Sequence, residues 1–221
     1  LLLILLSFSC RQEPVHVPPN PTPESISYLA LGDSYTIGES VDPEDRWPVQ
    51  LAAELAEAGF EVEDPRIIAQ TGWTTANLQN ALDQQHPPAD YDLVSLLIGV
   101  NNQYQGRSLS EYQVEFEELL LESIRLAAGD TGHVFVVSIP DYGYTPYGAS
   151  HQATITDEVN TFNAATKTIT ESYGIPFYDI TPTSRQNEDD YVAGDGLHPS
   201  GKQYGDWVAV FQEAVARQLI D

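Results

Sequence analysis

Two separate segments of the chain carry residues that could together hydrolyse an ester. Ser34 lies in a Gly-Asp-Ser run that directly follows an apolar stretch, and Asp195 lies three residues before His198 far along the chain. A serine hydroxyl is a weak nucleophile that needs a base within hydrogen-bond reach, and a carboxylate behind an imidazole fixes its tautomer. These residue types predict Ser34 as nucleophile, His198 as general base and Asp195 as the carboxylate that orients the imidazole.

The same chemistry requires donors for the negative charge that develops on the ester oxygen. The backbone N–H groups of Ser34 and Gly72 and the side-chain amide of Asn101 could supply them. Each feature also has a structural interpretation: Gly-Asp-Ser and Asn101 are common in turns, and Gly72 could be an ordinary loop glycine. The Asp195-x-x-His198 pair could cap a helix or form half of a metal site.

The stretches between these residues alternate between strand and helix patterns. Apolar runs predict strands over residues 27–31, 66–69, 93–98, 133–139 and 176–180. Helical spacing of apolar residues predicts helices over residues 46–58, 75–82, 110–128, 156–173 and 201–219. Ser110 is expected as the N-cap of the third helix. Near-continuous apolar strands between amphipathic helices indicate a parallel sheet covered on both faces, hence a three-layer α/β/α domain.

In such sheets, reactive groups gather beyond the carboxyl ends of the strands. Ser34 follows the first predicted strand, Gly72 the second and Asn101 the third. The loop with Asp195 and His198 follows the last strand and can fold back over the same edge. We therefore expect these residues to lie together, and their convergence favours catalysis over five unrelated structural roles.

Four blocks of the sequence resemble the SGNH hydrolase superfamily, the GDSL esterases and lipases. The blocks are residues 31–36, Gly72, residues 99–102 and residues 195–200, within a similarity that spans about residues 27–219. The resemblance implies a flavodoxin-like five-stranded parallel sheet and a Ser-His-Asp mechanism through an acyl-enzyme, without a cofactor. It departs from the family pattern at Tyr35-Thr36, where leucine gives the family its name, and at Asn102, where aspartate is usual.

Aromatic residues in the predicted loops at this edge are candidates for substrate binding: Trp73, Tyr104, Tyr142 and Tyr144. Tyrosine and tryptophan rims suit sugars and other amphipathic alcohols, although they also pack in cores. We expect a serine esterase for carboxylic esters of small molecules, glycans or lipids. The alternative is a surface lipoprotein that binds glycans without turnover, its pocket blocked by a residue such as Trp73.

Other chemistries find little support in the sequence. Residues 196–202 match the first positions of a phosphate-binding loop, but Gln203 stands where the Mg²⁺-binding Ser or Thr is required. G-x-S-x-G, H-E-x-x-H and G-x-G-x-x-G motifs are absent from the sequence. No metal or cofactor is therefore expected.

The charge balance argues against nucleic acid as a partner. The sequence has 9 Lys and Arg against 33 Asp and Glu, a net charge of −24, so no basic stripe can neutralise phosphates. The acidic residues are spread along the chain, which is typical of a solvated surface and also of proteins adapted to saline surroundings, where salt screens carboxylate repulsion. Oligomeric state cannot be predicted from these features.

The N-terminal residues predict export and anchoring. Residues 1–9 look like the end of a truncated signal peptide, with an apolar run too short to span a bilayer. Ser-x-Ser before Cys10, the only cysteine, resembles a bacterial lipoprotein signal, although Ser7 and Phe8 depart from its usual pattern. We expect a lipidated Cys10 and a Pro-rich tether over residues 10–25, then one hydrolase domain over residues 26–221, held in the bacterial cell envelope outside the cytoplasm.

Overall fold

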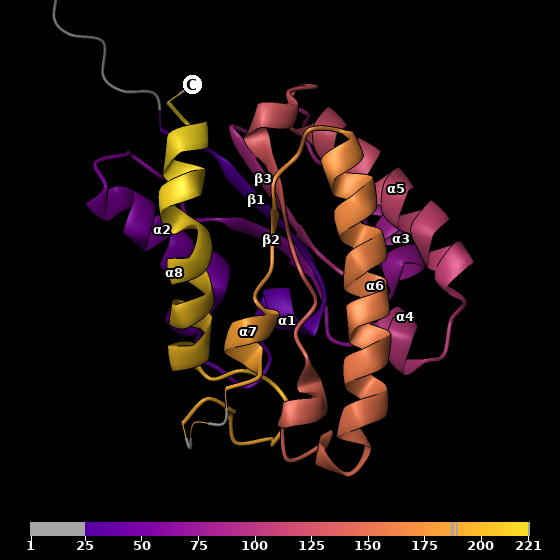
Figure 1. Ribbon diagram of the computed structural model, residues 1–221. Helices are drawn as coiled ribbons and strands as arrows, with labels where there is room; N and C mark the ends of the chain where they lie inside the picture. The colour runs from indigo at the N-terminus through magenta and orange to yellow at the C-terminus, as the bar shows by residue number, and fades with distance from the viewer. Residues whose placement is uncertain (1–24, 187, 189, 221) are drawn as a thin grey trace, which may run out of the picture.

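A computed structural model describes residues 25–186, 188 and 190–220, and these residues form a three-layer α/β/α domain (Figure 1). Its sheet has five parallel strands in the order β2-β1-β3-β4-β5. The strands are β1 (Tyr28–Gly32), β2 (Arg66–Ala69), β3 (Leu93–Leu97), β4 (Val134–Val137) and β5 (Phe177–Tyr178). The fold class predicted from the alternation of strand and helix patterns is confirmed.

Helices cover both faces of the sheet. They are α1 (Ser34–Ile37), α2 (Trp47–Glu57), α3 (Thr75–Gln85), α4 (Val100–Tyr104), α5 (Leu109–Leu126), α6 (Gln152–Ser172), α7 (Thr181–Ser184) and α8 (Gly201–Gln218). The described connections between elements include four 3₁₀ turns: η1 (Pro43–Asp45), η2 (Thr131–His133), η3 (Tyr142–Tyr144) and η4 (Ala149–His151). Helices α2 and α8 pack together on one face, and α3, α5 and α6 cover the other (Figure 1).

Aromatic side chains join the helical layers to the sheet. On the face of α2 and α8, the Trp47 ring lies edge-on to Phe211 at 5.9 Å and to Phe135 of β4 at 6.4 Å between centroids. On the other face, the rings of Tyr112 in α5 and Phe162 in α6 lie 4.7 Å apart and join these two helices to each other. Such rings bury roughly 150–250 Å² each and favour tilted contacts, so they fix how the helices sit on the strands.

The register of the sheet brings the ends of three strands into line. Gly32 of β1 pairs with Ala69 of β2 and with Leu97 of β3. Residues that follow these strands therefore emerge at one edge. Glycine is required at position 32 because the chain turns back at once into α1, where a Cβ would lie 2.1 Å from the Thr36 hydroxyl and 2.5 Å from the Leu97 carbonyl oxygen.

The structure differs from the predicted elements mainly at their ends. Helix α3 continues to Gln85, α6 begins at Gln152, and β5 has only two residues. The N-cap of α5 is Ser108, whose hydroxyl accepts from the Glu111 N–H, and the prediction of Ser110 was wrong. Ser108 has the extended backbone that a cap requires, with φ −66° and ψ 141°, whereas Ser110 already lies inside the helix. The short helices α1, α4 and α7 were not predicted, because four or five residues carry no measurable periodicity.

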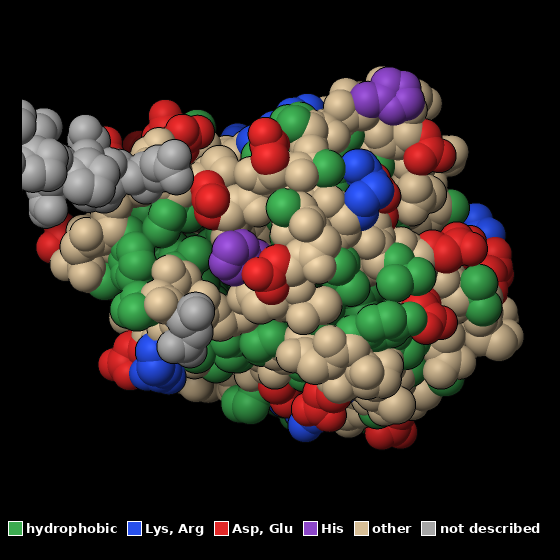
Figure 2. All heavy atoms as spheres, turned by 90° about the horizontal axis from the view of Figure 1, so that it is seen from above, with side chains coloured by type: hydrophobic (Ala, Val, Ile, Leu, Met, Phe, Trp, Pro, Cys, Tyr) green, Lys and Arg blue, Asp and Glu red, His purple; other side chains and the backbone are tan. Residues whose placement is uncertain are grey.

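The start of β1 and the end of α8 lie at one end of the molecule, and α1 and α7 lie toward the other (Figure 1). Figure 2 looks onto the first of these ends, where Asp and Glu side chains are scattered among neutral and apolar ones, with Lys and Arg in a few separate places. On this face the acidic side chains are therefore spread over the surface and do not gather in one patch. Within the described residues, none of the helices has the length and apolarity needed to cross a bilayer. Residues 1–9 and Cys10, with the predicted signal and lipidation site, lie outside the described part.

Candidate active site

Ser34 is the first residue of helix α1, and its surroundings fix it in place. Asp33 caps the helix by accepting a hydrogen bond of 3.0 Å from the Tyr35 N–H. Gly38 ends the helix in a left-handed conformation at φ 71°, and its N–H donates to the Ser34 carbonyl over 3.1 Å. The Ser34 N–H lies in the first turn, where a helix leaves its N–H groups unbonded and able to bind an anion.

His198 and Asp195 are joined as the sequence predicts. His198 Nδ1 and Asp195 Oδ2 are 2.7 Å apart, and Asp195 Oδ1 accepts from the backbone N–H groups of Leu197 and His198 over 2.9 and 3.0 Å. Partial burial by itself would raise the pKa of Asp195. The hydrogen bonds from His198, Leu197 and Ser40 outweigh it and hold this pKa below its ordinary value. Asp195 therefore remains a carboxylate that can keep Nδ1 protonated and leave Nε2 as the basic nitrogen.

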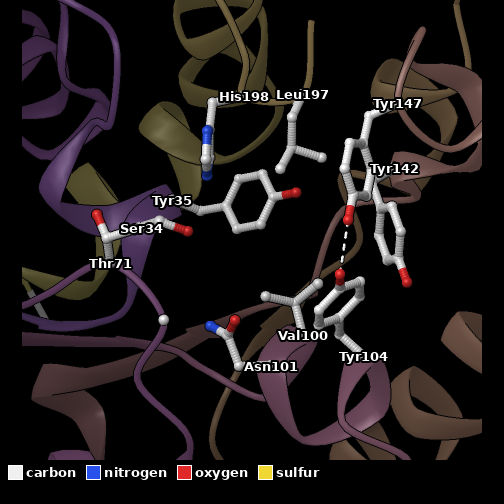
Figure 3. Close-up of a pocket in the computed structure, with 11 residues that line it drawn as sticks. Ser34, Tyr35, Thr71, Val100, Asn101, Tyr104, Tyr142, Tyr147, Leu197 and His198 are labelled. Carbon is white, nitrogen blue, oxygen red and sulfur yellow. Dashed lines mark hydrogen bonds between the residues drawn. The ribbon is translucent and has the colours of Figure 1, made fainter. Parts of the chain in front are cut away.

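Ser34, His198 and Asn101 line one pocket. Figure 3 shows the Ser34 hydroxyl directed into the space between the His198 ring and the Asn101 amide. The cavity has a volume of about 190 Å³. Its lining consists of Ser34, Tyr35, Thr71, Gly72, Val100, Asn101, Tyr104, Tyr142, Tyr147, Leu197 and His198. The strand register and the return of the last loop thus bring together the residues that the sequence separates by up to 164 positions.

The two other predicted oxyanion donors lie in the same lining. Gly72 has φ +83°, a left-handed backbone that other residues adopt at a cost, and this conformation accounts for the glycine. The Asn101 side-chain amide donates to the Trp73 carbonyl over 2.9 Å. This bond orients the amide and leaves its second N–H available to the pocket.

The residue after Asn101 has a separate role that holds the loop carrying Gly72. Asn102 is buried, and its Oδ1 accepts from the Thr75 N–H at the start of α3 over 3.0 Å. Its Nδ2 donates to the Thr75 hydroxyl over 2.6 Å, and that hydroxyl donates to the Glu115 carboxylate. Where the family pattern has an aspartate at position 102, this chain has a neutral amide, and the negative charge comes from Glu115 of α5.

Three tyrosines form the wall opposite His198 (Figure 3). Tyr104 of α4 and Tyr147 of the loop after η3 are joined by their hydroxyls, 2.6 Å apart. Tyr142 is buried beside them and donates to Gln103 Oε1 over 2.9 Å. Tyr104 and Tyr142 thus lie where the sequence predicted substrate contacts. Tyr147 was not selected, although it belongs to the tyrosine-rich run 141–147 that drew attention to this loop.

Trp73 and Tyr144 are not among the lining residues, contrary to the prediction. The Trp73 side chain packs against the hydrophobic core, and only its carbonyl turns toward the site. Tyr144 lies two residues after Tyr142 in a 3₁₀ turn, where such residues point in different directions. A pocket blocked by Trp73, on which the non-catalytic alternative depended, is therefore not observed.

A buried ion pair that the sequence did not suggest anchors the loop of Tyr142. Asp141 is fully buried, and its carboxylate accepts from Arg185 Nε over 2.9 Å and from the Thr156 hydroxyl over 2.7 Å. Its other oxygen accepts from the Gly143 N–H over 3.0 Å. This arrangement connects β4, α6 and the segment after α7, so the tyrosine wall has a fixed base.

The sequence left open that Asp195 and His198 form half of a metal site. The described residues contain no group of three or more His, Cys, Asp or Glu side chains arranged to hold a metal ion. The capping role that Asp195 and His198 could have had is also accounted for, since the N-cap of α8 is Ser200.

Known proteins resemble this chain in sequence profile and in fold. The sequence profile of the GDSL-like lipase/acylhydrolase family matches residues 30–205. A solved structure of a lipolytic G-D-S-L family protein from Veillonella parvula is similar with a TM-score of 0.66 at 18% identity, covering 86% of this chain and 97% of that one. The comparison with curated protein sequences gave no match.

Two esterase structures are also similar. A mutant of an acetyl-xylooligosaccharide esterase from Geobacillus has a TM-score of 0.67 at 18% identity, covering 88% of this chain and 96% of that one. A carbohydrate acetylesterase from Sinorhizobium meliloti has a TM-score of 0.61 at 20% identity, covering 87% of this chain and 99% of that one. At these identities the structures show a shared fold. Because the family profile spans most of the chain, this protein belongs to the GDSL-like lipase/acylhydrolase family of hydrolases.

Proposed function

We propose that the protein is a serine esterase that hydrolyses carboxylic esters with short acyl groups through an acyl-enzyme on Ser34. One observation carries the proposal: the Ser34 hydroxyl shares a pocket with the imidazole of His198, whose Nδ1 lies 2.7 Å from the Asp195 carboxylate. A base held in this way is what a serine hydroxyl requires to act as a nucleophile.

The proposed reaction has two halves. Ser34 Oγ attacks the ester carbon and its proton passes to His198 Nε2, while the carbonyl oxygen becomes an oxyanion facing the Ser34 and Gly72 N–H groups and the Asn101 amide. Collapse expels the alcohol, which takes the proton from His198 and leaves an acyl group on Ser34. Water then attacks this acyl-enzyme, His198 accepts and returns a proton, and the carboxylic acid leaves with Ser34 restored.

The pocket supports a short acyl group and a polar alcohol. A volume of about 190 Å³ is below the range of roughly 300–1,000 Å³ found for drug-sized ligands. The side chains of Tyr104 and Tyr147 are exposed, so their hydroxyls and ring faces can contact a saccharide beside the pocket. The similar structures named for acetyl-xylooligosaccharide and carbohydrate acetyl esters point the same way. Acetylated glycans are therefore the proposed substrates, ahead of phospholipids.

A test combines activity with active-site labelling. Wild-type protein should hydrolyse p-nitrophenyl acetate and acetylated xylooligosaccharides and be labelled by a fluorophosphonate probe. Ser34→Ala should lose hydrolysis by at least about 10⁴-fold and lose labelling. The matched control is Ser123→Ala, which removes an equally buried hydroxyl that only donates to the Leu119 carbonyl, and it should keep full activity. Full activity of Ser34→Ala would reject the nucleophile, and preference for long-chain lysophospholipids would reject the substrate class.

We also propose that the enzyme acts outside the cytoplasm, held in a bacterial cell envelope by lipid on Cys10. The support lies in the sequence before the domain, where an apolar run ends in Ser-x-Ser-Cys and a Pro-rich stretch follows. Expression of the full-length gene should give a membrane-bound protein whose N-terminal peptide carries acyl chains on Cys10 by mass spectrometry. A Cys10→Ala variant that remains membrane-bound would contradict the anchor.

A further inference from the structure

Glu39 and Ser40, the two residues after the Gly38 cap of helix α1, touch both of the loops that complete the pocket. Their attachment begins at the nucleophile itself: the N–H groups of Gly38 and Glu39 both donate to the Ser34 carbonyl, over 3.1 and 3.0 Å. The position of this dipeptide is therefore tied to the position of the Ser34 backbone. The two side chains then extend in different directions, one toward Asp195 and the other toward Thr71.

Ser40 connects the nucleophile segment to the proposed acid–base pair. Its hydroxyl donates to Asp195 Oδ2 over 2.7 Å, and this is the oxygen that also faces His198 Nδ1. The remaining donors to Asp195 are the N–H groups of Leu197 and His198, which lie within three residues of it. Those local bonds orient Asp195 relative to His198 only. The Ser40 bond spans 155 residues and orients the pair relative to Ser34.

The backbone of Ser40 is held in a conformation that serine rarely adopts. Its φ is +67°, and the other non-glycine residues with positive φ in the described part are His86 and Ala128. His86 and Ala128 lie at the C-terminal ends of α3 and α5, where left-handed residues commonly end helices. Ser40 lies beyond the glycine that ends α1. Strained residues of this kind persist where the surroundings over-determine them, and they cluster at functional sites.

Glu39 makes the matching contact on the other side of the pocket. Its carboxylate accepts a hydrogen bond from the hydroxyl of Thr71, the residue before Gly72. Thr71 lies in the turn after β2 that presents the Gly72 N–H to the pocket. One dipeptide thus reaches the acid–base loop and the oxyanion loop, and both contacts start from the segment that carries the nucleophile.

We propose that Glu39 and Ser40 form a positioning brace, in which Ser40 sets the Asp195–His198 pair, and Glu39 the Gly72 turn, relative to Ser34. The proposal rests on the esterase function above. Neither residue lines the pocket, so the brace acts through the groups that do. Its loss should lower kcat and leave KM nearly unchanged, since a displaced reacting group weakens the transition state more than substrate binding.

The Ser40 arm is tested with two variants that remove the same hydroxyl. Ser40→Ala keeps the backbone strain and Ser40→Gly relieves it, so Ser40→Gly should melt a few degrees higher than Ser40→Ala. Both should lower kcat on p-nitrophenyl acetate by about 10- to 100-fold with KM within about twofold of wild type. Without the Ser40 hydroxyl, the Asp195 charge acts more strongly on the imidazolium, so the acid limb of kcat/KM should move up by about half a pH unit. Ala128→Gly, which relieves the same kind of strain away from the pocket, should change stability and not activity.

Variants of Glu39 test its half of the brace separately from the Ser40 half. Glu39→Ala should lower kcat about 10-fold without moving the acid limb, because its contact is on the oxyanion side. Glu39→Gln retains an oxygen that can accept from Thr71 and should recover most of the lost rate. Equal loss in Glu39→Gln and Glu39→Ala would overturn this arm, since it would show that the carboxylate acts by charge.

The outcomes distinguish the brace from the esterase proposal. If wild-type protein is labelled by the fluorophosphonate and Ser34→Ala is inactive, but Ser40→Gly has wild-type kcat and pH profile, the brace is wrong and the esterase stands. A difference in kcat between Ser40→Ala and Ser40→Gly would also overturn the Ser40 arm, because backbone strain would then be the cause. If wild-type protein is neither labelled nor active, the esterase proposal fails and the brace fails with it.

Discussion

The segment that leads into Ser34 and the segment that leads into His198 each contain one carboxylate, and the two are treated in opposite ways. Asp33 is fully buried, and among the described residues its Oδ2 has no hydrogen-bond partner, so burial raises its pKa to about 7 despite the bond from the Tyr35 N–H. Asp195 is also partly buried, yet donors on both of its oxygens lower its pKa. The two residues lie beside one proposed reaction centre.

The difference indicates where the proposed site needs a negative charge. In the proposed mechanism, Asp195 must stabilise a positive imidazolium during turnover, and its hydrogen-bond donors favour the ionised form by lowering its pKa. Asp33 caps a four-residue helix, a task that needs only one acceptor oxygen, so a neutral group suffices there. Pairs of titratable groups whose surroundings push their pKa values apart are typical of catalytic centres.

The largest effect is expected from neutralising the ionised member. Asp195→Asn should lower kcat by roughly 10⁴-fold, because an amide cannot stabilise the imidazolium and favours the wrong tautomer. Its melting temperature should change little by comparison. Asp130→Asn is the matched control, since Asp130 accepts from the Gly132 N–H over 2.8 Å in an exposed turn and an amide oxygen can do the same. Activity of Asp195→Asn within tenfold of wild type would remove the proposed role.

Removing the charge of Asp33, the fully buried carboxyl, should have the opposite effect, and this effect should appear in the stability of the fold. A carboxyl whose folded pKa is raised from an unfolded value near 4 to about 7 binds its proton more tightly when folded, so stability falls as pH rises from about 4 to 7. The full cost, on the order of 4 kcal/mol, applies above pH 7. Asp33→Asn keeps the cap and removes the charge, so it should melt higher than wild type at pH 8 and show no such gain at pH 4. An equal difference at both pH values would contradict the raised pKa.

Glu115 provides a third case, a carboxylate whose hydrogen-bond donors hold the structure around the pocket. It accepts from the Thr75 hydroxyl and, over 3.5 Å, from Asn102 Nδ2. Both donors bond to Oε2, so Glu115→Ala, which removes this acceptor, should cost about 1–2 kcal/mol of unfolding free energy, measured by urea denaturation. Because Thr75 begins the helix after the Gly72 turn, kcat should fall about threefold. The double variant with Asn102→Asp places a carboxylate beside the Thr75 hydroxyl again and should recover stability; failure to do so would show that the charge must stay on α5.

The smallest effect is expected on the tyrosine side, where no carboxylate lines the pocket. Tyr104 and Tyr147 are 58% and 52% exposed, so the hydroxyl bridge between them competes with water. Tyr147→Phe removes one hydroxyl and should change kcat on p-nitrophenyl acetate by less than about twofold. Its KM for an acetylated xylooligosaccharide should rise by a factor of about three if the rim holds the sugar. An unchanged KM would place the sugar elsewhere.

The contrast between local and distant contacts also explains which site residues could be predicted. Ser34, Gly72 and Asn101 each follow a strand, and parallel strands in register bring their carboxyl ends to one edge, so sequence order was sufficient. Asp195 and His198 are three residues apart, and their contact is local. Ser40, Glu39 and Glu115 were missed because their partners lie 155, 32 and 40 residues away, and nothing in their own neighbourhood indicates those partners.

The pocket wall shows the same limit. A tyrosine-rich loop at the sheet edge was recognised, but which ring faces the cavity depends on a 3₁₀ turn and on the buried Asp141–Arg185 pair that anchors it. Tyr142 therefore lines the pocket and Tyr144 does not. Trp73 was assigned to the pocket from its position after Gly72, yet its side chain turns to the core, since burying an indole contributes more than leaving it at a rim.

The amino-acid sequence by itself determined the layered α/β architecture, the edge of the sheet where chemistry gathers and the residues that could perform it. These follow from apolar periodicity and from the order of polar residues after strands, both of which are local properties. Only the tertiary structure decided the size of the pocket, the rings that line it and the hydrogen bonds, from the residues after α1 and from α5, that hold its loops. Those depend on side chains distant in sequence meeting at one point, where packing and the pairing of buried polar groups select one arrangement.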